Sequence, residues 1–320
     1  MPLKIVCGAA SFGDPSRIPN AEFTQPILDV LTANGIKQLD TAYIYQESRA
    51  EAILGELKAG SKQEFVIDSK VKSFVPGAHH YESLMETVEE QYKRLDVKQI
   101  NILYLHAPDR TVPFEESHRA MNELYEKGYF KYFGLSNYTA DDVQTFLDNA
   151  EKYGWIKPSY YQGLYNLLAR KPEQELFPLL KKNNIFFYAY RPLAGGFFSN
   201  IKRGEAPAEG GRFDTNTLPG SIWQSFFYKD GLFAAKEKVN ELASKYAISS
   251  NAIALRWIIH HSEISKYSDE NAVIIGGSRI SQIEENVKNA LAGPLPDELV
   301  EQVNKLWETI DVDEQPTVTW

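Results

Sequence analysis

The most informative side chains in this sequence are four groups that can move or stabilise a proton. Each comes at, or just after, the end of an apparent β-strand; they are Asp40, Tyr45, Lys70 and His106. In a barrel of parallel strands, the carboxyl ends of all strands meet at one rim, where barrel enzymes carry out their chemistry. Residues far apart in the sequence would then share one pocket, and the pattern favours an enzyme.

These four groups together suit the reduction of a carbonyl group. A phenol has a pKa of about 10 in water, so Tyr45 is a useful acid at neutral pH only if its anion is stabilised. The ammonium of Lys70 could stabilise it, and Asp40 could hold that lysine in place and charged. His106 could orient a carbonyl oxygen towards the phenol while a hydride arrives from a cofactor.

Each of the four residues also has an ordinary structural explanation when taken singly. A tyrosine often packs in a core, a lysine is often solvated, and an aspartate often caps a turn or helix. A lone histidine is more often a hydrogen-bonded structural group than a catalytic one. Only their joint placement at neighbouring strand ends favours the catalytic interpretation.

The elements that would position these residues are short β-rich runs alternating with helical patterns along most of the chain. Eight is the number of strands at which a parallel sheet closes around side chains, so we predict an α/β fold, a (β/α)8 TIM barrel, as one domain over 1–320. The predicted strands are 4–8, 38–42, 65–70, 100–106, 132–136, 159–162, 185–190 and 273–276.

Helical periodicity between these runs is clearest over 82–95, and a capped helix start is predicted around Thr139. Residues 199–231 are rich in Gly, Pro and polar side chains, which predicts a functional loop or lid. Two further helices are predicted over 233–246 and 251–261. The tail 311–320 lacks periodicity, and we expect it on the surface or over the barrel mouth.

Composition excludes several other classes of protein. A net charge of -9 argues against broad binding to nucleic acid or to anionic membranes, and no apolar run approaches the ~18 residues of a membrane helix. The single cysteine, Cys7, rules out an internal disulfide and a cysteine cluster for zinc. The first residues show no signal-peptide pattern, so we expect a cytoplasmic protein, a monomer or homodimer, acting on a small-molecule carbonyl substrate without a metal.

Several motifs resemble one known family. The motif Asp40-Thr41-Ala42-x-x-Tyr45, then Lys70, then Leu105-His106-Ala107-Pro108-Asp109, is similar to the aldo-keto reductase family. The segments 134–138, 161–163 and 188–196 resemble its aflatoxin-aldehyde reductase branch. The likeness extends from about 8 to 289. It implies an (α/β)8 barrel that reduces aldehydes or ketones with NADPH, with Tyr45 as the proton donor.

The resemblance also implies where the nicotinamide end of the cofactor would bind. Ser136, Asn137 and Gln162 match positions that hold the carboxamide, and Tyr190 matches the aromatic that stacks on the ring. These roles are physically reasonable, because amides pair with an amide and a flat phenol covers a flat heterocycle.

The phosphate end has two pieces. A loop containing Leu193, Gly195 and Gly196 lets its backbone come close to a pyrophosphate, since glycine has no obstructing side chain. A helix is expected to start after the last strand, and helix N-termini attract phosphate. The positions in this segment that match the family's adenosine-end motif are Gly276, Ser278, Arg279, Gln282, Glu285 and Asn286. Arg279 is our choice for the 2′-phosphate, because a guanidinium makes paired contacts with it. Arg191 stands where the branch usually has asparagine, and with Arg212 it completes the candidate cofactor residues.

The substrate side of the pocket is expected to include Tyr45, His106, Trp223 and Phe226. The stretch 221–228 lacks the arginines that relatives use for carboxylate-bearing aldehydes, which favours an aromatic or apolar carbonyl substrate. Arg191 or Arg212 could instead reach into the pocket and restore an anion site. The alternative function is a weakly catalytic, redox-sensing barrel that acts as a regulatory subunit, and metal or Schiff-base chemistry is a weaker third possibility.

Overall fold

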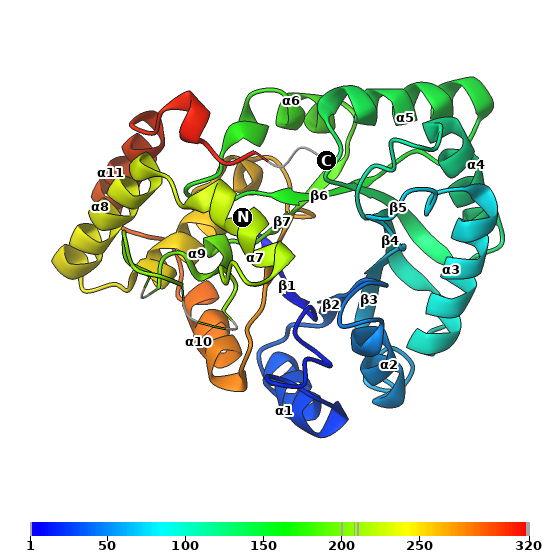
Figure 1. Cartoon of the computed structure of the whole chain (residues 1–320), viewed down its shortest axis with the longest axis horizontal. Coiled ribbons are helices and arrows are strands. Elements are labelled where there is room, and N and C mark those ends of the chain that lie inside the picture. Colours follow the sequence, from blue (N-terminus) through cyan, green and yellow to red (C-terminus); the bar gives the residue numbers. More distant parts are fainter. Residues whose placement is uncertain (1, 200, 208, 210, 318–320) are drawn as a thin grey trace.

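The computed structural model, which describes all residues except 1, 200, 208, 210 and 318–320, is a closed barrel of parallel strands surrounded by helices (Figure 1). The predicted (β/α)8 TIM barrel is therefore confirmed. Each strand pairs with the next one along the chain, and the last pairs with the first. The strands are β1 Lys4–Gly8, β2 Gln38–Asp40, β3 Val66–Lys70, β4 Ile100–Leu105, β5 Phe130–Ser136, β6 Tyr160–Leu164, β7 Phe186–Tyr190 and β8 Ala272–Ile275.

The outer layer consists of helices that follow the strands and cover the outer face of the sheet (Figure 1). They are α1 Ala21–Ala33, α2 Arg49–Glu56, α3 Tyr81–Leu95, α4 Phe114–Glu126, α5 Ala140–Tyr153, α6 Leu176–Lys182, α7 Leu218–Phe227, α8 Asp230–Tyr246, α9 Ser250–His260, α10 Ile280–Ala290 and α11 Asp297–Glu308. The helix predicted over 82–95 is α3. Thr139 caps α5 in a capping box, since its hydroxyl accepts from the Asp142 N–H and the Asp142 carboxylate accepts from the Thr139 N–H. Among the described residues, no helix is long and apolar enough to cross a membrane.

The segment 199–231 differs from the predicted loop. It contains α7, a helix of 10 residues, and α8 already begins at Asp230. Thr217 caps α7, because its hydroxyl accepts from the Gly220 N–H. The glycine and proline content of this segment predicts a loop and not a helix. Trp223 and Phe227 of α7 are buried, and such packing stabilises a helix whose residues have a low helix propensity.

Side chains on β3 show how the barrel sorts residues between its two faces. Ser69 points outward, where its hydroxyl donates to buried Glu51 of α2 at 2.6 Å. Its neighbours Asp68 and Lys70 therefore point into the barrel, because side chains alternate along a strand. The interior is filled by a separate cluster: Val6, Ile102, Tyr104, Tyr160, Tyr188, Ala272 and Ile274.

Gly134 makes room for the largest of these interior side chains. It lies directly opposite Tyr104 in the β4–β5 register. A Cβ atom at Gly134 would lie 2.2 Å from the Tyr104 ring, closer than atoms can approach. A glycine is therefore required for the Tyr104 ring to lie across β5 inside the barrel.

The tail beyond α11 packs against the start of α8. The N–H of Gly231 donates to the Glu314 carboxylate at 2.7 Å, and Lys229 Nζ donates to the Asp313 carbonyl at 3.0 Å. The described part of the tail thus lies on the surface beside α8, where its acidic side chain satisfies a helix N-terminus. Residues 318–320 lie outside the described part.

Candidate functional site

Lys70 and Asp40 form a buried ion pair at the carboxyl ends of β3 and β2. Lys70 Nζ lies 2.8 and 2.7 Å from the two carboxylate oxygens of Asp40 and donates to the Thr41 carbonyl at 2.7 Å. Both side chains are almost completely buried. Burial alone would lower the pKa of Lys70, but the charges of Asp40 and Tyr45 outweigh it and raise the pKa above its ordinary value. Lys70 therefore carries a positive charge at neutral pH.

Tyr45 and His106 lie on the solvent side of this pair. Lys70 Nζ is 5.0 Å from the centroid of the Tyr45 ring, and the Tyr45 and His106 rings meet edge to face at 5.9 Å. Burial, followed by the charge of Lys70, holds the pKa of His106 well below its ordinary value, so its ring is neutral. The four residues predicted to act together do converge at one rim of the barrel.

The loop after β2 holds Tyr45 in a strained turn. Gln46, Glu47 and Ser48 all have positive φ angles, of 51°, 56° and 69°, which side chains other than glycine adopt only at a cost in free energy. Local hydrogen bonds support the turn: Ser48 Oγ donates to the Tyr43 carbonyl at 2.7 Å, and Gln46 Nε2 donates to the Ala10 carbonyl at 3.0 Å. The turn thereby fixes the backbone on the C-terminal side of Tyr45.

A chain of hydrogen bonds links the amide residues after β5 to the aromatic residue of β7. Asn137 Nδ2 donates to the His106 carbonyl at 2.9 Å and to Ser136 Oγ at 3.1 Å. Its Oδ1 accepts from the Tyr190 hydroxyl at 2.7 Å. The candidate carboxamide residues and the candidate stacking residue therefore form one rigid group beside His106.

Gln162 belongs to the floor of the same site. It is buried on β6, and its Nε2 donates to Asp40 Oδ1 at 2.8 Å. The Asp40 carboxylate thus receives hydrogen bonds from both the Lys70 ammonium and the Gln162 amide. These two donors hold the buried carboxylate in one orientation.

The wall formed by α7 combines aromatic rings with a cation, since Arg191, one of the two arginines that could reach the pocket, lies against it. The guanidinium of Arg191 lies flat over the ring of buried Trp223, and half-buried Phe226 contacts Trp223 at 5.5 Å between ring centroids. Arg191 Nη1 is buried and makes no hydrogen bond within the described structure. Burial and the nearby charge of Arg212 hold the pKa of Arg191 well below its ordinary value. Position 191 is far from α7 in sequence, so the residues of α7 alone gave no sign of this cation.

Phe227 and Tyr228, the last two residues of the stretch 221–228, belong to the core beneath this wall. The Phe227 ring packs on Phe197 at 5.8 Å and the Tyr228 ring on Phe213 at 5.4 Å. Their place follows from helical geometry, because successive residues of a helix point about 100° apart and cannot all face one pocket.

The glycine loop lies beside Arg191 and Arg212. A Cβ at Gly195 would lie 3.4 Å from Arg212 Cγ and 3.6 Å from Arg191 Nη1, whereas one at Gly196 would meet nothing within 4 Å. Leu193 is half-buried beside them. Both glycines have positive φ angles, of 69° and 94°, which glycine alone adopts without strain.

The start of α10 keeps the predicted adenosine-end residues close together. Gln282 Oε1 accepts from the Ser278 N–H and hydroxyl, each at 2.9 Å, and buried Asn286 donates to the Gly276 carbonyl at 2.9 Å. Arg279 and Glu285 are exposed. Arg279 makes no side-chain cap to the helix, so the N-terminal amide groups of α10 remain open to a ligand.

Phe74 is a site residue that sequence reasoning missed. Its ring contacts the His106 ring at 5.1 Å, yet 47% of the residue is exposed, and its φ angle is 68°. An exposed aromatic ring against a rim histidine is placed to contact a substrate. Its position in the loop four residues after Lys70 was the only available signal.

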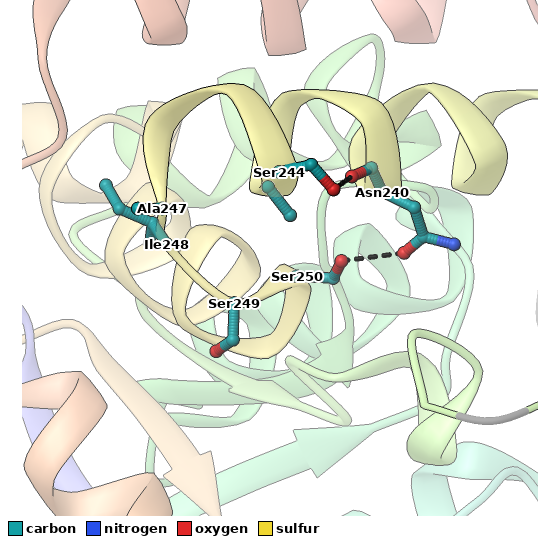
Figure 2. A pocket seen from close by; sticks show the side chains of 7 residues that line it. Asn240, Ser244, Ala247, Ile248, Ser249 and Ser250 are labelled. Carbon is teal, nitrogen blue, oxygen red and sulfur yellow. Dashed lines mark hydrogen bonds between the residues drawn. The ribbon is translucent and has the colours of Figure 1, made fainter.

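A surface hollow lies elsewhere on the molecule (Figure 2). It sits between the end of α8 and the start of α9 and is lined by small polar and apolar side chains such as Asn240 and Ser250, which are joined by a hydrogen bond of 2.7 Å. These residues offer no acid, base or nucleophile arrangement. Within the described chain, no group of three or more His, Cys, Asp and Glu side chains could hold a metal ion.

A parallel eight-stranded barrel whose carboxyl rim carries a tyrosine, a neutral histidine and a buried Lys–Asp pair belongs to the class of barrel enzymes. Comparison with known proteins specifies the family. The sequence profile of the Aldo/keto reductase family matches residues 4–308, and the chain belongs to that family. It is therefore an oxidoreductase of a family that acts on carbonyl groups.

Relatives cover nearly the whole chain. An aldo-keto reductase of Pseudocercospora fijiensis is 37% identical over 91% of this chain and 99% of its own length. Human aflatoxin B1 aldehyde reductase member 4 is 36% identical, over 94% of this chain and 93% of its own. Human aldo-keto reductase family 7 member A3 is 35% identical, over 95% and 94%.

Proposed function

We propose that this protein reduces an aldehyde or ketone to an alcohol with NADPH, and that Tyr45 supplies the proton. The buried Lys70 ammonium, held between Asp40 and the Tyr45 ring, is the observation that supports this role. A fixed positive charge beside a phenol stabilises the phenolate that forms as the proton leaves. The relatives include aflatoxin B1 aldehyde reductases, and this likeness supports the same reaction.

The residues present fit a nicotinamide cofactor. When bound, NADPH would supply the hydride. Asn137 and Gln162 offer amide groups at the inner end, and Tyr190 offers a flat ring held in place by its hydrogen bond to Asn137. Gly196, whose missing Cβ leaves open space, lets a phosphate come close to its loop, and the uncapped start of α10 offers backbone N–H groups.

Within this site each residue of the chain has a separate task. His106, neutral because it is buried beside Lys70, can hydrogen-bond a carbonyl oxygen without repelling the Lys70 charge. Asp40 keeps Lys70 charged, and Gln162 keeps Asp40 oriented. The carbonyl oxygen would thus lie between Tyr45 and His106, where it receives the proton.

The substrate is proposed to carry an aromatic or extended apolar group. Phe74, Trp223 and Phe226 line the mouth with rings, and ring stacking contributes roughly 0.5–1.5 kcal/mol beyond the area buried. Arg191, stacked on Trp223, adds a cation to this wall, and it makes an anionic substituent the competing possibility.

Tyr45→Phe tests the proposal directly. The purified protein is assayed for NADPH oxidation with aromatic, aliphatic and carboxylated aldehydes, and Tyr45→Phe should reduce kcat by at least ~10²-fold with unchanged cofactor affinity. Tyr125→Phe, at an exposed tyrosine of α4, is the matched control and should behave like the wild type. Wild-type turnover in Tyr45→Phe would contradict the mechanism. Tight NADPH binding without appreciable turnover of any aldehyde would favour a redox-sensing regulatory barrel instead.

A further inference from the structure

The barrel interior holds a second buried carboxyl group directly below the site. Asp68 lies on β3, two residues before Lys70, and is paired in register with Asp40 on β2. Because residues two apart on a strand share a face, Asp68 points into the interior beneath the Lys70–Asp40 pair. It is fully buried, and the reaction proposed above does not use it.

The contacts of Asp68 can serve either protonation state. Its Oδ1 accepts from Asn101 Nδ2 at 2.7 Å and from the Ile102 N–H at 3.2 Å, and its Oδ2 accepts from Gln38 Nε2 at 2.6 Å. Asn101 and Ile102 hold one oxygen in place. The Gln38 side-chain amide can flip, because its oxygen and nitrogen are nearly equal in shape. Its oxygen would then accept a hydrogen bond from a protonated Oδ2 of Asp68.

Titratable groups surround Asp68 on several strands. Asp40 and Lys70 face it from the rim side, and Tyr104, Tyr160 and Tyr188 face it from β4, β6 and β7. Burial is the main cause that raises the pKa of Tyr104 well above its ordinary value, and the charges of Asp68 and Asp40 add to it.

Burial is the main reason that the pKa of Asp68 is raised to about 7, with a smaller contribution from the charge of Asp40. The hydrogen bonds from Asn101 and Gln38 oppose this shift. A carboxyl group in these surroundings gains or loses its proton in the range where enzymes work.

We propose that Asp68 is a positioning residue: its carboxyl group, buried in the barrel beneath the Lys70–Asp40 pair, tunes the Lys70–Tyr45 pair through its charge. An anionic Asp68 offsets part of the Lys70 charge and makes the Tyr45 phenolate less stable. With this charge present, reduction should stay active to higher pH than without it. The expected effect on the rate of reduction rests on the proposed function, whereas the titration of Asp68 does not.

Asp68→Asn tests the kinetic consequence, because the amide imitates the protonated carboxyl. The alkaline limb of kcat/KM for NADPH-dependent reduction should move to lower pH by roughly one unit, the effect of one charge a few ångströms away at an effective dielectric of about 20. Asp96→Asn, which removes an exposed carboxylate paired with Lys58, is the matched control and should leave the profile unchanged. An unchanged profile in Asp68→Asn would overturn the inference.

Infrared spectroscopy of the unliganded protein tests the titration without any turnover. A protonated-carboxyl band should disappear in the wild type as pH rises through about 7, and it should be absent in Asp68→Asn. Gln38→Leu removes a hydrogen bond to the charged form, so the same band should persist to higher pH. If the infrared band titrates as expected but neither the wild type nor any variant reduces an aldehyde, the proposed function is wrong and the titration of Asp68 still holds. Absence of a titrating band in the wild type would refute the role of Asp68, even if Asp68→Asn does not fold.

Discussion

Replacing Lys70 by methionine should remove most of the catalytic rate. Lys70 Nζ lies 5.0 Å from the Tyr45 ring centroid. At an effective dielectric of about 20, two unit charges at that separation interact by about 3 kcal/mol. If the transition state loses this energy, the rate falls by a factor of roughly 10². We therefore expect Lys70→Met to lower kcat by about 10²-fold.

The buried position of Lys70 requires a control for misfolding. Lys70→Met leaves the Asp40 carboxylate buried without its ionic partner, and breaking such a pair costs about 3–5 kcal/mol of stability. The double variant Asp40→Asn/Lys70→Met removes both charges and keeps the hydrogen bond from Gln162 possible. If the missing ammonium is the cause, the double variant regains thermal stability but not activity.

The assay compares initial rates of NADPH oxidation at saturating aldehyde and cofactor with thermal unfolding of the same preparations. Cofactor affinity, measured by fluorescence titration, should change little, because Lys70 lies below the phenol and is completely enclosed. A folded Lys70→Met protein that keeps kcat within about threefold of the wild type would refute the charge-stabilisation argument. Recovery of activity in the double variant would instead assign the loss to the unpaired Asp40.

Two further predictions concern ligand choice. Arg279→Ala should weaken NADPH binding by ~10-fold or more and leave NADH binding nearly unchanged, because only NADPH carries the 2′-phosphate; equal losses for both, in parallel titrations, would assign Arg279 another task. Aromatic aldehydes should exceed succinic semialdehyde in kcat/KM by up to about tenfold, the effect of ring stacking against Trp223 and Phe226. If succinic semialdehyde is the better substrate and Arg191→Met abolishes that preference, the wall binds an anion through Arg191.

The order of strands and the identity of the rim residues could be predicted because local patterns carry them. A run of β-branched and aromatic residues marks each strand, and its last residue lies at the rim wherever the sheet closes. The strand predicted over 4–8 matches β1 at both ends. β2 ends at Asp40, two residues earlier than predicted, since the chain turns there to present Tyr45. Such boundaries depend on the turn that follows rather than on the pattern inside the strand.

Long-range contacts could not be predicted in the same way. Arg191 lies on the α7 wall, and Phe74 lies against His106, only because loops from different strands meet over the mouth. Neither contact has a signature in the residues around it. Helix α7 was hidden for a related reason, because its formation depends on buried aromatic packing and its local composition is that of a loop.

The sequence by itself determined the alternation of strands and helices, the residue types at each strand end, and the resemblance that assigns them roles. Only the tertiary structure determined which of these strand-end side chains are in contact with one another. Lys70 meets Asp40 across 30 residues and Gln162 meets Asp40 across 122, because closing the barrel brings all strand ends to one rim. Closure also removes water from Asp68 and His106, which shifts the pKa of Asp68 upward and that of His106 downward. Burial is a property of the whole fold, and no local pattern of residues contains it.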